Sequence, residues 1–473
     1  MGTVMKRSLL VLLVFGLAWG GAILYWQGSS RAPDSTDLLL YLLVLPLAIL
    51  LLLWLGKFLI GMLAAAPAIA VAAADAPPPA PPPPAPVPPL GVLASALRVP
   101  FGASAKELAE ALAEQKVRPA LDPALVDEDG FPVMSARVDD ADDPGVQDDM
   151  QAWLPHNGFP VLQYNDEQWR ALTLASAVTR ELAEQVALHR ALGPVPAPAA
   201  APATPPLPPL PTLQLLMLWQ AGWHQDQRSA AGQWLAHLVA QAGWPRERIA
   251  LDPELAGDPS VATPAALVQR LARQSADGHP VLALVVACAS HIGDASVARW
   301  AGQNSLLTAK QGQGRLPGEG AAALLLADPV QAALIDGKAP VQLLSAEGQR
   351  DASADSARRA DASVLRTLSE QVLARAASAA AEVKLIVADT GNRTTRVMEA
   401  MSLAGALLPE LDGDDELLQV GSASGTCGAV PFLAALAVAA QQAAKLNAPV
   451  LCLSNEDPFR RCAALVRPAT VLS

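Results

Sequence analysis

Charged residues, cysteines and metal-binding spacings are scarce in this chain. Only 16% of its residues are charged, its formal net charge is −12, and no stretch is basic enough to neutralise phosphates. A nucleic-acid partner is therefore excluded from the candidate functions. The four cysteines form no CxxC pair, and the six histidines form no HExxH or HxH pair. We therefore expect no metal and no cofactor, and we expect the cysteines to be small buried residues of a reduced protein.

Hydrophobic residues and prolines are abundant instead. They include 52% hydrophobic residues and 42 prolines, a mixture typical of membrane segments and proline-rich linkers joined to a globular part. Two uncharged runs, 9–26 and 38–56, are long enough to cross a bilayer as helices. Lys6 precedes the first run and Lys57 follows the second, and basic residues prefer the cytoplasmic side. We predict a membrane hairpin over residues 1–62 in a bacterial inner membrane, with both flanking segments in the cytoplasm.

A cleaved signal peptide is the alternative interpretation of the first run. Bulky Trp19, Tyr25 and Trp26 crowd its end, and no small-x-small cleavage site follows directly. These residues favour an uncleaved helix.

Two linkers divide the remainder of the chain. Residues 63–90 are rich in alanine and proline, and residues 194–211 form a second proline-rich stretch. The composition predicts a small α/β domain over 91–193 and a layered α/β domain over 212–473, because strand-like and helix-like patterns alternate in both.

The predicted small domain contains a helix with an N-terminal signature. Ser104 and Glu107 form a capping box at the start of the helix expected over 104–116. A strand is expected at 131–138 and a long helix at 167–192. Six aspartates lie within 139–149, but the spacing of a calcium-binding loop is missing, so we expect a solvated acidic loop.

The larger domain has a longer series of elements. Strands are expected at 213–219, 281–288, 321–327, 341–344, 383–388, 450–454 and 463–466, and helices at 229–242, 264–274, 360–381, 393–408 and 428–446. The sequence ALDP occurs at 120–123 and again at 250–253, which is too short to establish an internal duplication.

The segment Gly318-Glu319-Gly320 stands directly before the apolar run 321–327. Two glycines around one carboxylate suggest a close approach of two backbones. A buried carboxylate needs partners, so we expect Glu319 to accept hydrogen bonds from backbone donors or from a basic side chain.

Three segments resemble the β-ketoacyl synthases of the thiolase-like superfamily. They are PGEGAAALLLAD at 317–328, VADTGNRTTRVMEAMSL at 387–403, and GSASGTCGAVPFLAALAVAA at 421–440. The resemblance implies a layered thiolase-like α/β domain over 212–473, and it places Glu399 at the family's helix glutamate.

The same resemblance implies a nucleophilic cysteine and two histidines, and none is found at its position. The loop expected to carry one histidine contains Asp389 and Asn392, and Thr426 stands where the second is expected. The nucleophile belongs well upstream of Gly318, where no cysteine precedes Cys288; Cys427 begins the last long helix. These five residues are candidates for a vestigial site, and we predict no catalytic residue among them.

The layout as a whole, together with the segment 120–138, is similar to the lipase-adapter family of type VI secretion systems. That resemblance implies a non-catalytic, membrane-anchored cytoplasmic adapter, which binds a lipase effector and helps to load it on the secretion-spike protein. A membrane-tethered acyltransferase of the ketosynthase type, using Cys288 or Cys427, is the alternative. A structural membrane component without cargo is a third hypothesis, and homodimerisation is left open.

Overall fold

The computed structural model describes residues 88–193, 208–257, 262–335, 341–356, 360–409 and 416–469, together with Phe15, Trp19, Gly20 and Leu45. The predicted membrane hairpin and most of both predicted linkers fall outside these residues. Within the described part of the chain, no helix is both long and apolar enough to cross a bilayer.

A mixed sheet of ten strands organises the compact unit Pro84–Ser473, in the order β10-β9-β11-β12-β8-β1-β7-β6-β4-β5. Its first half consists of β1 (Leu90–Arg98), β4 (Leu213–Trp219), β5 (Ile249–Leu251), β6 (Leu282–Ser290) and β7 (Glu319–Ala327). Its second half consists of β8 (Val341–Gln349), β9 (Leu385–Ala388), β10 (Leu417–Gln419), β11 (Val450–Ser454) and β12 (Arg460–Pro468). A separate two-stranded sheet pairs β2 (Ala120–Val126) with β3 (Pro132–Ser135).

The two halves repeat one topology. In the first, β1 pairs antiparallel with β7, β7 antiparallel with β6, and β6 and β5 each run parallel to β4. In the second, β8, β12, β11, β9 and β10 follow one another with the same sequence of directions. The chain is thus duplicated internally. The ALDP repeat does not mark this duplication, because both copies lie in the first half.

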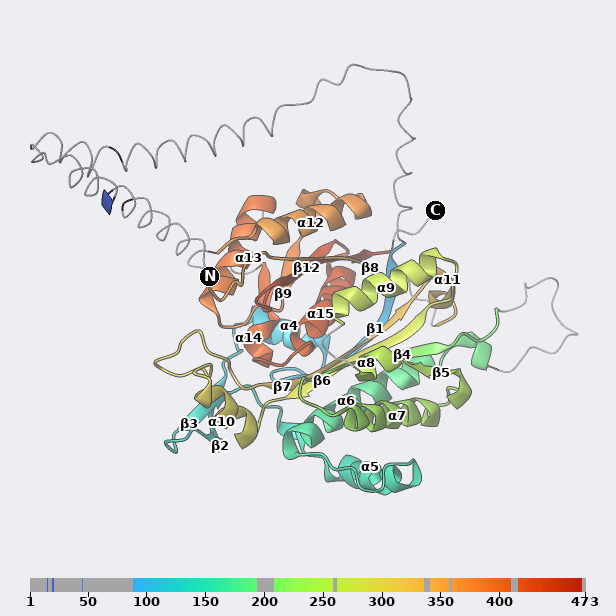
Figure 1. The fold of residues 1–473 in the computed structure, drawn as a ribbon. Coiled ribbons are helices and arrows are strands. Elements are labelled where there is room, and N and C mark those ends of the chain that lie inside the picture. The colour runs from blue at the N-terminus through green and yellow to red at the C-terminus, as the bar shows by residue number, and fades with distance from the viewer. Residues whose placement is uncertain are drawn as a thin grey trace, which may run out of the picture. The chain divides into compact units, whose positions relative to one another are not determined.

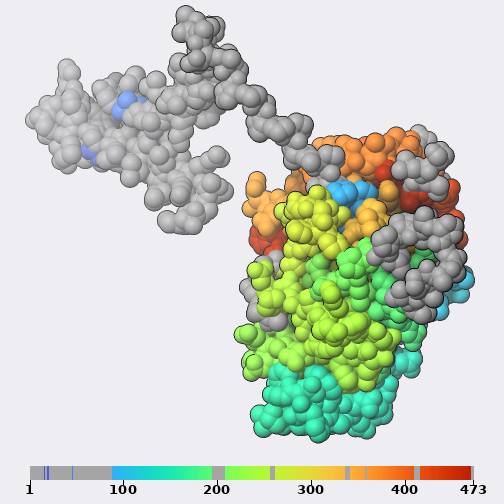
Figure 2. Space-filling view, turned by 90° about the vertical axis from the view of Figure 1, so that its right-hand side faces the viewer, coloured from blue at the N-terminus to red at the C-terminus, as the bar shows by residue number. Residues whose placement is uncertain are grey.

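Helices cover both faces of each half (Figure 1). The long helices are α4 (Ala105–Ala113), α5 (Pro144–His156), α6 (Asp166–Val186), α7 (Gln225–Gln241), α9 (Pro264–Ala276), α10 (Asp294–Gly302), α12 (Ser363–Ala376), α13 (Thr394–Leu407) and α15 (Val430–Leu446). Short helices are α8 (Pro253–Gly257), α11 (Pro329–Ala332) and α14 (Val420–Ser424). Figure 2 shows the early segments, in teal and green, at one end of the unit and the late segments, in orange and red, at the other.

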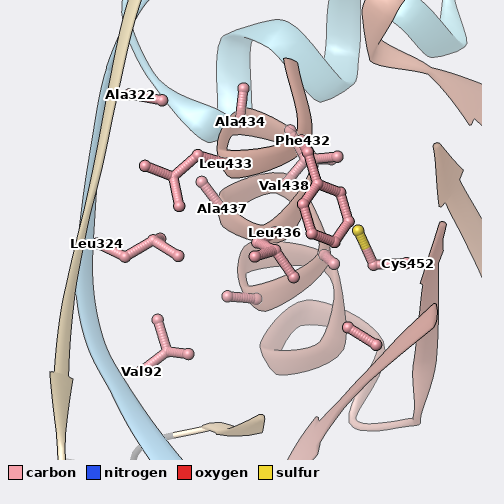
Figure 3. Close-up of a cluster of buried hydrophobic side chains, with 14 of the residues drawn as sticks. Val92, Ala322, Leu324, Phe432, Leu433, Ala434, Leu436, Ala437, Val438 and Cys452 are labelled. Carbon is pink, nitrogen blue, oxygen red and sulfur yellow. The ribbon is translucent and has the colours of Figure 1, made fainter. Parts of the chain in front are cut away.

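Three apolar cores result from this layering. One lies between the halves around α4, α9 and α15, a second lies under α6 and α7, and a third lies under α12 and α13. In Figure 3, α15 directs Leu433 toward Leu324 of the first half, while Phe432 lies beside Cys452 of the second. Because both faces of the strands are covered, β6 and β7 are buried at every position and read as continuous apolar runs.

Most elements predicted from the sequence for residues 212–473 are confirmed, with boundaries shifted by a few residues. The division into a small domain over 91–193 and a separate one over 212–473 is wrong. Strand β1 lies between β7 and β8, and α6 packs on β6 and β7, so residues from both predicted domains share one core. The sequence concealed this because strand pairing joins segments that lie far apart along the chain.

The acidic stretch 139–149 is only in part a loop. A 3-10 turn covers Asp139–Ala141, and α5 starts at Pro144 with Asp143 as its N-cap. Acidic residues stabilise a helix start, so aspartates that read as a loop also serve as a helix N-terminus. The cap at Ser104 is confirmed, although Glu107 Oε2 accepts from the backbone N of Ala103 rather than of Ser104.

Candidate functional site

Glu319 begins β7 and is completely buried. Its Oε1 accepts hydrogen bonds from the backbone N of Val138 at 2.8 Å and from Arg170 Nη2 at 2.5 Å. Its Oε2 accepts from Arg170 Nε at 2.8 Å and from Ser290 Oγ at 2.9 Å. The prediction of backbone and basic partners is confirmed, and the carboxylate joins β7, β6, α6 and the segment after β3.

The glycines on either side of Glu319 allow two backbones to touch. A Cβ at Gly318 would lie 2.0 Å from the carbonyl oxygen of Ser424, and one at Gly320 would lie 3.0 Å from that of Arg98. Pro317 also forms a bridge with Thr426. The predicted close approach is therefore confirmed, and it brings the loop before α15 against the start of β7.

Thr426 and Cys427 lie in this loop. The backbone N of Thr426 donates to Leu316 O at 2.8 Å, and Cys427 Sγ contacts Ala289 O at 3.5 Å. Only 1% of Cys427 is exposed. Burial, reinforced by the charge of Glu319, raises the pKa of its thiol well above the ordinary value, so it stays protonated at neutral pH.

Cys288 lies on β6 and is also 1% exposed. It belongs to the core beneath α6 and α7, whereas Cys427 belongs to the core between the halves. Burial raises the pKa of Cys288 to about 12. The two thiols therefore lie in different cores, on opposite faces of the first half of the sheet, and neither is ionised at neutral pH.

Asp389 follows β9 and is held by the loop after β11. Its Oδ1 accepts from the backbone N of Asn455 at 2.8 Å, and its Oδ2 accepts from Ser454 Oγ at 2.5 Å. Burial raises the pKa of Asp389 to about 6. A Cβ at Gly421 would lie 2.0 Å from Asp389 O, so the loops that carry Asp389 and Thr426 are adjacent. Asn392, in contrast, is exposed.

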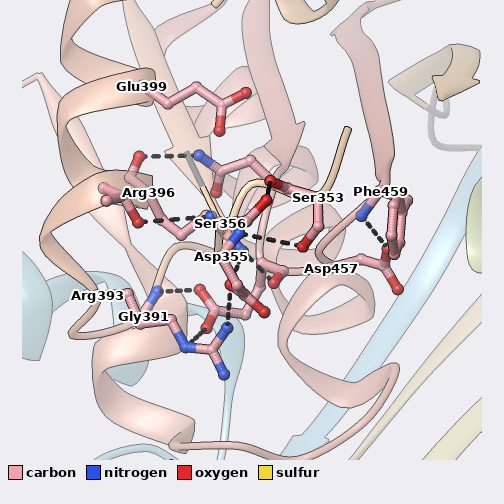
Figure 4. Close-up of polar contacts among 12 residues, drawn as sticks. Ser353, Asp355, Ser356, Gly391, Arg393, Arg396, Glu399, Asp457 and Phe459 are labelled. Atoms are coloured by element: carbon pink, nitrogen blue, oxygen red, sulfur yellow. Dashed lines mark hydrogen bonds and ion pairs between the residues drawn. The ribbon is translucent and has the colours of Figure 1, made fainter. Parts of the chain in front are cut away.

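Ion pairs occupy the outer side of this loop (Figure 4). Arg393 pairs with Asp355 at 3.1 Å and with Glu456 at 3.3 Å, and Arg396 pairs with the same Asp355 at 2.5 Å. The backbone N of Gly391 donates to Glu456 at 3.1 Å. The polar side chains around the loop thus satisfy one another.

Glu399 on α13 has a role like that of Glu319. It is 1% exposed and accepts two hydrogen bonds from Arg461 of β12, at 2.7 and 3.0 Å. Arg350 adds a contact at 3.3 Å. Each half of the fold thus contains a buried carboxylate that a guanidinium binds with two nitrogens, the geometry that gives the strongest side-chain hydrogen bonds. Both contacts join elements of the fold.

The sequence gave no motif for the basic partners Arg170 and Arg461. Each interrupts an otherwise apolar face, Arg170 on the buried side of α6 and Arg461 inside the strand β12. A charged residue at an apolar position is the signal that could have identified them, because buried charges are nearly always paired.

His291 illustrates why adjacent residues do not form a site. Ser290 directs its hydroxyl to Glu319, whereas His291 Nδ1 lies 3.0 Å from both Ser296 Oγ and Gln220 Nε2. Burial, with the nearby charges of Arg299 and Arg315, lowers the pKa of His291 to about 3. It is a neutral buried histidine without contact to either cysteine among its described hydrogen bonds.

Other sites are few in the described part of the chain. No group of three or more histidine, cysteine, aspartate or glutamate side chains there could hold a metal ion. A pocket of about 290 Å³ opens between the end of α4 and β10, and Ser422 lines it. None of the five vestigial-site candidates lines this pocket.

No protein-family model matches this chain, and no curated protein matches it. Its structure is similar to the ketosynthase from module 6 of the bacillaene synthase of Bacillus subtilis, with 12% identity, 81% of this chain and 72% of that chain covered, and a TM-score of 0.53. An oxazolomycin ketosynthase domain from Streptomyces albus gives 13% identity, 81% and 75% coverage, and a TM-score of 0.53. The thiolase-like layered fold is confirmed, and it includes the segment before residue 212. At these identities the likeness concerns the fold alone.

Proposed function

We propose that this chain is a non-catalytic adapter with a ketosynthase-like fold, anchored to the inner membrane and facing the cytoplasm. It binds a type VI secretion lipase effector and helps to load it on the secretion spike. The observation that carries the non-catalytic part is the state of Cys288 and Cys427, each 1% exposed with a raised thiol pKa. Covalent catalysis by cysteine needs an accessible thiolate, which this environment opposes.

The groups at the other vestigial positions support the same proposal. Asp389 accepts hydrogen bonds from the loop after β11, and Thr426 uses its backbone to hold the start of β7. Both serve the contacts between the halves of the fold. At the start of α9, the counterpart of α15 in the first half, Thr263 Oγ1 accepts from the backbone N of Ala266 as a helix cap, so a hydroxyl occupies the position at which a nucleophile would need to stand.

The secretion role and the location rest on resemblance in layout. Its supports are the predicted hairpin over 1–62, the spacer 63–90 and the segment 120–138. A lipase and a spike protein as neighbours in the genome would agree with this role. A phosphatase fused after Ser473 should be inactive in intact cells, and an active periplasmic fusion would contradict the cytoplasmic location.

The second candidate function is a membrane-tethered acyltransferase, which the ketosynthase-like fold favours. Intact-mass measurement of the full chain after incubation with acyl-coenzyme A separates the two. We expect no adduct, together with binding of the lipase in a two-component purification. A stoichiometric acyl adduct that disappears in Cys288→Ala or Cys427→Ala would overturn the adapter proposal in favour of the enzyme.

A further inference from the structure

The β2–β3 hairpin projects from the body of the protein beside α10 (Figure 1). One of its faces is buried: Leu125 and Val133 are 2% and 5% exposed and contact α10 residues, including Trp300. On the same inner face, Asp122 accepts hydrogen bonds from Ser135 Oγ and Arg137 Nε, both at 2.8 Å. The hairpin is thus firmly attached through this face.

The opposite face is apolar although it faces solvent. Leu121 and Met134 are direct cross-strand partners and are 63% and 37% exposed. Val126, paired with Pro132, is 43% exposed, and Phe131 beside them is 66% exposed. An antiparallel pair with one wet face normally carries polar residues there, and contiguous exposed apolar side chains mark interaction sites.

Carboxylates stand at the end of this apolar face. The turn between the strands reads Asp127-Glu128-Asp129, and Glu128 and Asp129 are exposed. Asp127 Oδ1 accepts from the backbone N of Asp129 at 3.0 Å and of Phe131 at 2.9 Å, so the turn that presents Phe131 is held in place. The surface is therefore preorganised, which lowers the entropy lost on binding.

We infer that the outer face of the β2–β3 hairpin, formed by Leu121, Val126, Phe131, Pro132 and Met134, docks a protein partner whose contact surface is apolar and flanked by lysine or arginine. This inference rests on the proposed adapter function and names the docking surface for its cargo. Apolar contact supplies the affinity, and the acidic turn selects a basic rim and speeds association.

Charge disfavours the other occupants. A second copy would bring its own acidic turn to a chain of net charge −12, so like charges would oppose each other. An anionic membrane would repel the same turn. A basic partner gains from both features of the surface.

Photo-crosslinking tests the occupant. A benzophenone amino acid replaces Phe131 in the full chain, expressed in its own cells, and replaces Val161, which is 89% exposed, as the control. We expect an adduct with another protein from position 131 only, and a mapped crosslink within an apolar segment flanked by lysine or arginine. An adduct with a second copy, a crosslink in an acidic segment, or no adduct would overturn the inference.

Affinity measurements with the purified lipase supply the second test. Leu121→Ser with Phe131→Ser should raise Kd at least tenfold, whereas Val161→Ser should leave it unchanged. Glu128→Lys with Asp129→Lys should mainly slow association, and raising NaCl should weaken the unaltered pair. If the lipase binds the hairpin variant normally, the inference fails while the adapter function stands. If the unaltered chain does not bind the lipase, the proposed function itself fails.

Discussion

The buried contact between Glu319 and Arg170 gives the most direct test of how the fold is held together. Glu319 is 0% exposed and the side chain of Arg170 is 6% exposed. Glu319→Ala removes the acceptor of four hydrogen bonds, including those from Val138 N and Ser290 Oγ. The guanidinium then keeps Asp142, whose side chain is 67% exposed, as its remaining carboxylate partner.

Removing one partner of a buried ion pair leaves an uncompensated charge, which costs about 3–5 kcal/mol. Each unpaired buried donor costs about 1–3 kcal/mol, but these terms overlap because the side chains relax together. We therefore expect Glu319→Ala to lower the free energy of unfolding by about 3–5 kcal/mol. Glu319→Gln keeps the volume and one acceptor, so its loss should be smaller.

Urea unfolding of the purified full chain, followed by the fluorescence of its tryptophans, measures this change. Glu181→Ala is the matched control, because Glu181 pairs with Arg98 on the surface and its loss should cost under about 1 kcal/mol. Replacing both Glu319 and Arg170 with leucine should destabilise less than Glu319→Ala alone. A loss below about 1 kcal/mol for Glu319→Ala, or a double variant no better than the single one, would refute this account of the buried pair.

Three further predictions concern the vestigial site and its glycines. The pKa of Asp389 is higher in the folded state, at about 6 against the ordinary 3.8, so its stabilising contribution is present below about pH 4 and is lost as pH rises toward 6. Asp389→Asn should flatten this decline in urea titrations and raise stability at pH 7.5, and an unchanged pH profile would contradict the raised pKa. Cys288 and Cys427 should resist iodoacetamide at pH 7.5 and react once the chain is unfolded, as mass spectrometry would record; rapid labelling of the folded chain would contradict their burial. Gly318→Ala should destabilise strongly, because its Cβ would lie 2.0 Å from a backbone oxygen, whereas Gly405→Ala on exposed α13 meets no atom within 4 Å and should stabilise by about 1 kcal/mol; equal unfolding midpoints would argue against the close approach.

The sequence by itself determined the local elements and the chemical requirement at Glu319. Apolar runs between breakers identified β4, β6, β7 and β11, because a strand covered on both faces leaves a continuous hydrophobic signal. Two glycines around a carboxylate next to such a strand required a close backbone contact and a partner for the charge. Both requirements are local properties of the chain, and so they could be read from it.

Only the tertiary structure decided which residues meet. Arg170 lies 149 residues from Glu319, and no local pattern selects it over other arginines of the chain. Strand β1 joins the centre of the sheet through pairing with β7 and β8, which overturned the predicted separate domain. The exposed apolar face of β2–β3 was also hidden, since the sequence shows apolar residues but not which face of the hairpin α10 covers. These outcomes depend on contacts between distant segments, and only the folded chain brings those segments together.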